Sequence, residues 1–85
     1  MIRIIKNEDV REVRVEIPEG HQHIRTTVVL RSGEELVFQE ATVSNILRAF
    51  ITVKTHPVKK SVVLRAKKLK EKKEGYAEWQ LLEDE

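Results

Sequence analysis

The chain has 85 residues, which is enough for one hydrophobic core. It contains no cysteine, and this excludes disulfide-stapled scaffolds, thiolate zinc sites and cysteine nucleophiles. Charged residues make up 35% of the sequence, but the formal net charge is +2, so the overall charge indicates no particular partner.

We expect a single domain over residues 1–85 with a frayed acidic end at about residues 83–85. No apolar run approaches the roughly 18 residues of a membrane helix, and the first residues become polar too soon for a signal sequence. We therefore expect a cytoplasmic protein with no membrane partner. Its many charges and few Asn, Gln and Met residues are typical of thermophile proteins.

The first half of the chain begins with a strand pattern. Residues 11–17 alternate, with Val13, Val15 and Ile17 on one face and charged side chains on the other. This pattern predicts a strand with one buried face. Residues 2–6 are a further candidate strand.

A hairpin follows. Residues 24–30 are rich in β-branched side chains and alternate again, which predicts a second strand. Residues 31–34 form the predicted turn, in which Gly33 supplies a positive φ, and residues 36–38 return antiparallel.

The apolar period changes after Glu40. A stripe at helical spacing is formed by Val43, Ile46, Leu47, Phe50 and Ile51. Thr42 is the predicted N-cap, and Glu40 places a negative charge near the positive end of the helix dipole. The helix is expected to end before Pro57, because the residue before a proline is disfavoured in the α region.

The last third of the chain fits two structures. Residues 61–74 could form a second helix, or a strand that turns at Gly75 and returns as residues 76–82. A three-residue turn favours the hairpin, because it would pair aliphatic with aromatic and basic with acidic side chains. The expected pairs are Leu69–Trp79, Lys70–Glu78 and Ala66–Leu82.

The predicted fold class is therefore α+β. We expect a small antiparallel sheet of four to five strands with one helix packed across it, in the order β-β-β-α-β-β. The predicted core consists of Val13, Val15, Ile17, Ile24, Val28, Leu30, Leu36, Phe38, Ile46, Leu47, Phe50, Val62, Leu64 and Trp79.

Catalytic and metal-binding patterns are weak. His21 and His23 would project to one side of a strand, with His56 as a third ligand, but they follow a Pro-Glu-Gly turn where solvated imidazoles are the ordinary expectation. The three glycines are isolated, so no phosphate-binding loop is indicated. We predict no enzyme activity, no catalytic residue, no metal, no cofactor and no small-molecule substrate.

The strongest functional feature is a basic segment at residues 59–73, which a run of acids follows. Such a cluster could bind phosphates by counterion release, with Tyr76 and Trp79 available to stack on bases. Alternatively, the lysines face solvent or pair with the acidic tail. The possible nucleic-acid-binding residues are Lys59, Lys60, Arg65, Lys67, Lys68, Lys70, Lys72 and Lys73.

The leading functional hypothesis is a small non-catalytic interaction or assembly domain that self-associates, as a homo-oligomer (a dimer) or with another protein. Val29, Val37 and Val63 are predicted on the strand faces opposite the core, and a small sheet offers free edges for another chain. The alternative is a nucleic-acid-binding module that uses residues 59–73.

Overall fold

The computed structural model describes residues 1–73 and 76–84, without the side chains of residues 70–73, 76 and 77. It confirms the α+β class and the order β-β-β-α-β-β. The backbone divides into two compact units, Met1–Val43 and Ser44–Glu85, so a single domain over the whole chain stays a prediction. The elements, after a 3₁₀ turn η1 (Asn7–Asp9), are β1 (Val10–Glu16), β2 (Arg25–Leu30), β3 (Glu35–Gln39), α1 (Glu40–Thr55), β4 (Leu64–Lys73) and β5 (Tyr76–Glu83).

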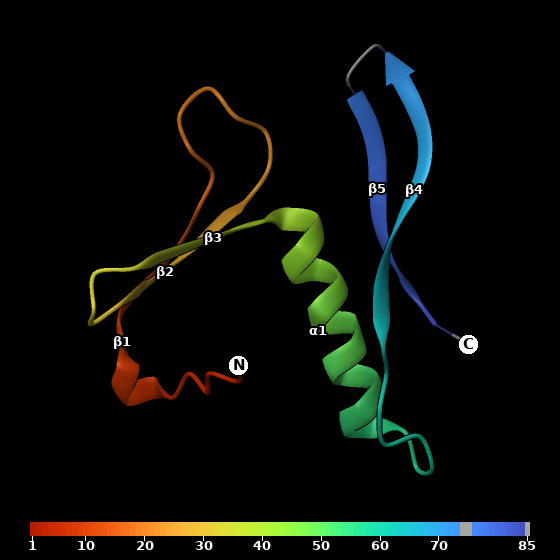
Figure 1. Ribbon diagram of the computed structural model, residues 1–85, viewed down its shortest axis with the longest axis horizontal. Helices are drawn as coiled ribbons and strands as arrows, with labels where there is room; N and C mark the ends of the chain where they lie inside the picture. The colour runs from red at the N-terminus through yellow and green to blue at the C-terminus, as the bar shows by residue number, and fades with distance from the viewer. Residues whose placement is uncertain (74–75, 85) are drawn as a thin grey trace. The chain divides into compact units, whose positions relative to one another are not determined.

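The strands form two antiparallel sheets, where one sheet of four to five strands was expected. β1, β2 and β3 make a three-stranded sheet in that order, and β4 pairs with β5 alone (Figure 1). In the first sheet, the alternation that predicted the strands also sets the two faces, because directly paired residues share a face. A β-bulge interrupts β1 between Val10 and Glu12.

The turn between β2 and β3 is as predicted. Gly33 has a φ of +94°, and its N–H donates to the carbonyl of Leu30 at 2.9 Å. Residues 2–6 form no strand. Instead, Arg3 makes an ion pair with Glu34 at 2.6 Å, and the Nε of Arg31 donates to the carbonyl of Glu8 at 2.7 Å. Side-chain contacts to the turn therefore hold the start of the chain.

Helix α1 starts directly where β3 ends, with no residue between Gln39 and Glu40. Thr42 was predicted as the N-cap, which is wrong, because it lies within the first turn of the helix. The predicted end is confirmed. Beyond Thr55, the Nδ1 of His56 accepts hydrogen bonds from the backbone N–H of Val58 at 3.1 Å and of Lys59 at 2.8 Å. The imidazole thus provides an acceptor for two backbone N–H groups of the turn that follows the helix.

β4 and β5 form a hairpin, which decides between the two structures considered for residues 61–74. Lys70 pairs with Glu78 as predicted, whereas Trp79 lies opposite Lys68 rather than Leu69. A register irregularity between Lys68 and Lys70 accounts for this shift, because one extra residue displaces all pairs beyond it. Ala66 therefore pairs with Leu81, not with Leu82. The predicted left-handed Gly75 lies outside the described residues.

Burial differs from the predicted core. Among the described residues, the buried ones are Val29, Leu30 and Thr27, and of these only Leu30 was predicted. Val29 was assigned to the outer face and is 1% exposed, whereas Val37 and Val63 are exposed as expected. The predicted core residues that are exposed are Val13, Val15, Ile17, Ile24, Ile46, Leu47, Phe50 and Trp79. The pattern identified apolar faces correctly, but nothing in either described unit covers these side chains.

Candidate interaction surface

The basic segment is split between a loop and the β4–β5 hairpin. Lys59 and Lys60 precede β4, and Arg65 and Lys67 alternate along one face of it. Lys68 lies on the opposite face, in register with Trp79, whose side chain is exposed. The side chains of Lys70, Lys72, Lys73 and Tyr76 lie outside the described part of the structure.

The acidic end of the chain neutralises part of this segment. Glu83 pairs with Lys59, and Asp84 accepts a hydrogen bond from the Nε of Arg65 at 2.7 Å. The backbone N–H of Asp84 also donates to the carbonyl of Val63 at 2.8 Å. Lys59 and Arg65 thus have acidic partners within the same unit. Fraying at residues 83–85 stays a prediction.

The histidines are not brought together as ligands. Within the described residues, no group of three or more His, Asp or Glu side chains could hold a metal ion. His23 lies 3.5 Å from the carboxylate of Glu40, and this same carboxylate accepts the backbone N–H of Ile24 at 2.6 Å. The imidazole of His56 is bound to the turn after α1. His23 and His56 therefore each have a polar partner close by in sequence or within their own unit.

Charged side chains cover the polar face of the three-stranded sheet around Thr27 and Val29, although Val37 on β3 is exposed. Arg14 on β1 donates to Glu12 at 2.8 Å and reaches across β2 to Glu35 on β3 at 3.5 Å. Thr27 and Val29 lie on the same face of β2, between these partners, and are 5% and 1% exposed. The hydrogen bond from Arg14 to Glu12 and the charge of that carboxylate raise the pKa of Arg14.

The apolar face of the same sheet is exposed along β1, although Leu30 at the end of β2 is buried. Its cross-strand rows are Val13–Val28–Leu36 and Val15–Thr26–Phe38. The central and β3 residues are half-buried by their neighbours, but Val15 is 67% exposed and Val13 is also more than half exposed. Ile17, just past the end of β1, is exposed as well. This face has the composition of a core surface and no cover within its own unit.

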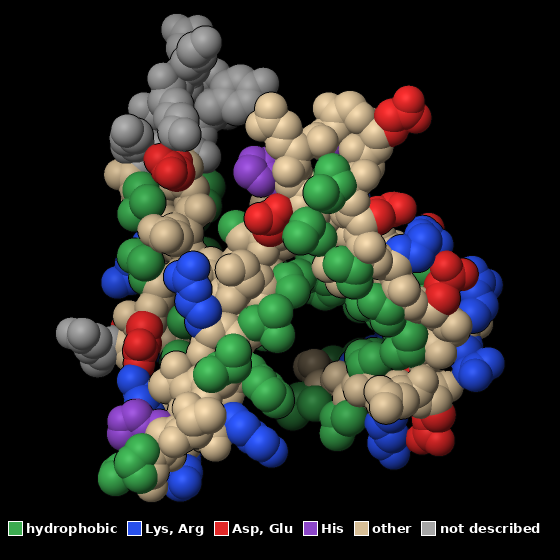
Figure 2. Space-filling view, turned by 180° about the vertical axis from the view of Figure 1, so that it is seen from behind, with side chains coloured by type: hydrophobic (Ala, Val, Ile, Leu, Met, Phe, Trp, Pro, Cys, Tyr) green, Lys and Arg blue, Asp and Glu red, His purple; other side chains and the backbone are tan. Residues whose placement is uncertain are grey.

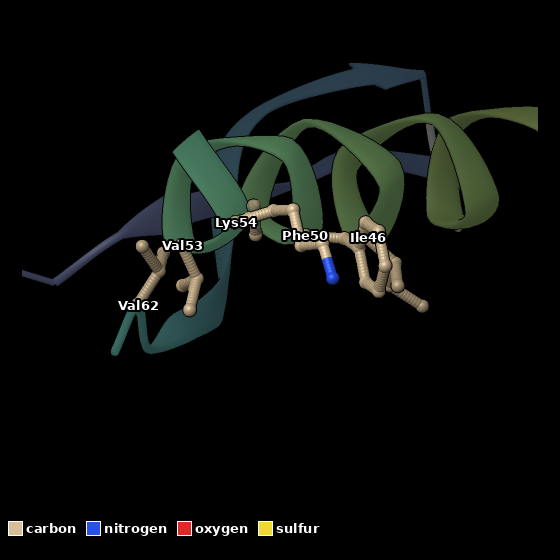
Figure 3. Close-up of a pocket in the computed structure, with 6 residues that line it drawn as sticks. Ile46, Phe50, Val53, Lys54 and Val62 are labelled. Atoms are coloured by element: carbon tan, nitrogen blue, oxygen red, sulfur yellow. The ribbon is translucent and has the colours of Figure 1, made fainter. Parts of the chain in front are cut away.

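The exposed apolar side of α1 forms a second surface. It consists of Ile46, Leu47, Phe50 and Ile51, and Phe50 is 62% exposed. An open pocket of about 370 Å³ lies on this side of the helix (Figure 3). It is lined by Ile46, Ala49, Phe50, Val53 and Lys54 of α1 and by Val62 from the chain before β4. We call the exposed side chains of Ile46, Leu47, Phe50 and Ile51 the helix stripe.

The other side of α1 faces the hairpin. A second pocket, of about 300 Å³, is lined by Asn45, Arg48, Ala49 and Thr52 of α1, by Val62, by Leu64 of β4 and by residues 80–83 of β5, so Ala49 and Val62 line both pockets. With 100° per residue, this side lies about 170° around the helix from the helix stripe. Within its own unit, α1 therefore turns its more polar side to the hairpin and leaves its apolar side open. Figure 2 shows that hydrophobic side chains gather in clusters on the face in view.

Comparison with protein-family models, with curated protein sequences and with solved structures finds no significant match. The described part of the chain contains no helix long and apolar enough to cross a membrane.

The prediction placed Ile46, Leu47 and Phe50 in the core, so it identified these residues but not their role as surface. One signal was present in the sequence. Residues 44–55 include polar residues at helical spacing, which form a second face of the helix. This polar face, rather than the apolar one, could have been expected toward the rest of the unit.

Proposed function

We propose that the chain is a non-catalytic self-association domain whose apolar surfaces are buried between copies. The observation that carries this proposal is the orientation of α1, which turns its polar side toward the hairpin across a pocket and exposes the helix stripe. Exposed apolar clusters of this kind mark interaction sites in soluble proteins.

The size of the chain gives a second argument for association. At 9.9 kDa, a single chain buries only a modest share of its surface in a core of its own. The absence of disulfides gives such a small chain a reason to be reinforced by association.

Nucleic-acid binding through residues 59–73 is the alternative. Its support is the run of cations beside the exposed Trp79. The ion pairs of Lys59 with Glu83 and of Arg65 with Asp84 favour the assembly hypothesis, because they reduce the charge available for phosphates.

Light scattering over a range of protein concentrations tests the proposal. We expect the mass of a dimer at micromolar concentration, and Phe50→Asp should shift the mass to that of a monomer with an unchanged circular dichroism spectrum. A monomer at high micromolar concentration for the unmodified chain would refute the proposal.

Retention on single- and double-stranded nucleic acid at two salt concentrations tests the alternative. Phosphate contacts predict binding that weakens steeply with salt, and replacing Lys67 and Lys68 by Ala should flatten that dependence. A monomer that binds in this way would replace self-association with the alternative. We expect no retention.

A further inference from the structure

We infer that the partner of the helix stripe is the apolar face of the three-stranded sheet in a second copy of the chain, and that the exchange is reciprocal. This inference rests on the proposed self-association and specifies its interface. In a two-fold dimer, each copy would contribute one sheet face and one helix stripe, so both apolar surfaces would be buried together.

The two surfaces match in chemistry. The open rows of the sheet present Val13 and Val15 on β1, with Phe38 half-buried on β3. The helix stripe presents Ile46 and Phe50, both at least half exposed. A helix that lies on one face of an antiparallel sheet is the standard way in which both elements bury their apolar sides.

The chain path favours a second copy over the same chain as the occupant. A helix that covers the sheet it has just left needs a connection in which the chain reverses, and such connections usually have 2–6 residues. Here β3 ends at Gln39 and α1 begins at Glu40, so no turn residue is available.

Charge complementarity points to the same pairing. Residues 1–43 contain eight acidic and six basic residues, a net charge of −2, whereas residues 44–85 contain ten basic and six acidic residues, a net charge of +4. No acidic residue occurs between residues 44 and 70, so the charges on α1 beyond its first turn are positive. A reciprocal arrangement places the basic unit of each copy on the acidic unit of the other, which favours association over like-with-like contacts.

The absence of native cysteine allows a direct test by cross-linking. The Val15→Cys and Phe50→Cys chains, one carrying a size tag, are mixed, refolded together and treated with a short bis-maleimide. We expect a covalent heterodimer as the main product. In the matched control, the Val37→Cys chain replaces the Val15→Cys chain in the mixture with Phe50→Cys. Val37 is 59% exposed and lies on the opposite face of the same sheet.

The outcomes separate this inference from the proposed function. A dimer in light scattering with no Val15→Cys to Phe50→Cys product, or with an equal product from Val37→Cys, refutes the interface and leaves self-association standing. A monomer refutes both. A chain that carries both Val15→Cys and Phe50→Cys and cross-links at monomer mass would show that its own helix covers the sheet, which also refutes the inference.

Discussion

The two faces of the three-stranded sheet differ in how their own side chains cover them, although each face has a buried residue on β2 and an exposed valine on an outer strand. On the polar face, Arg14 bridges carboxylates on both outer strands, and the side chains of Thr27 and Val29 beneath it are nearly inaccessible. On the apolar face, Val15 is 67% exposed. On a sheet face with nothing packed against it, a side chain is covered only where a neighbouring side chain is long enough to lie across it. Arginine is long enough to do this, and valine is too short. The polar face is covered around Val29 by side chains of its own unit, whereas Val13 and Val15 on the other face have no such cover.

The largest effect is expected from a charge on the apolar face. Val15→Asp should raise the dissociation constant of the dimer by at least about 100-fold, because a buried and unpaired carboxylate costs several kcal/mol. Val37→Asp places the same charge on the polar face. Val37 is already exposed there, in the same cross-strand row as Thr27 and Arg14. Sedimentation should show that its dissociation constant changes less than threefold. If Val15→Asp and Val37→Asp raised the dissociation constant of the dimer equally, the interface would not distinguish the two faces of the sheet.

The second prediction concerns the polar face. Val29→Ala should lower the free energy of unfolding by about 2 kcal/mol, because it removes buried methyl groups and leaves a cavity under Arg14. Val37→Ala, on the same face and exposed, should change it by less than about 0.5 kcal/mol. Urea denaturation of each variant at the same protein concentration measures both values. A small effect of Val29→Ala would show that the polar face contributes little to stability.

Local features of this fold could be predicted from the sequence because local rules determine them. Gly33 has the positive φ that its turn requires, Lys70 pairs with Glu78, and α1 ends before Pro57. The irregularity beside Leu69 could not be predicted, because no residue type there demands an extra residue in the strand. It shifted Trp79 by one position.

Burial was the part of the structure that the sequence could not provide. Val13, Val15 and Phe50 have the spacing of core residues, and that spacing is the same whether the cover comes from the same unit or from another copy. Pairing of the basic segment with the acidic tail was one of two alternatives, and the particular pair Arg65–Asp84 depends on where β5 ends relative to β4. Burial and this pairing both depend on contacts between residues that are distant in sequence.

The smallest effect is expected from Arg14 itself. Arg14→Gln removes both ion pairs but keeps much of the side-chain length over Val29, so the urea midpoint should fall by less than it does for Val29→Ala. Added salt should reduce the difference from the unmodified chain, because the pairs are exposed to solvent. Arg11→Gln is the control, since the described residues give Arg11 no ion pair.

The pH dependence of the Arg14→Gln effect follows from the direction of the pKa shift. The pKa of Arg14 is raised in the folded chain, so its stabilising contribution is present below that pKa and is lost only as the pH rises through it. That range lies far above neutrality, and the difference between Arg14→Gln and the unmodified chain should therefore not change across neutral pH. A difference that disappeared at mildly alkaline pH would contradict the role assigned to the guanidinium. If the urea midpoint of Arg14→Gln equalled that of the unmodified chain at low salt, the apolar stem of the side chain, and not its charge, would cover the polar face.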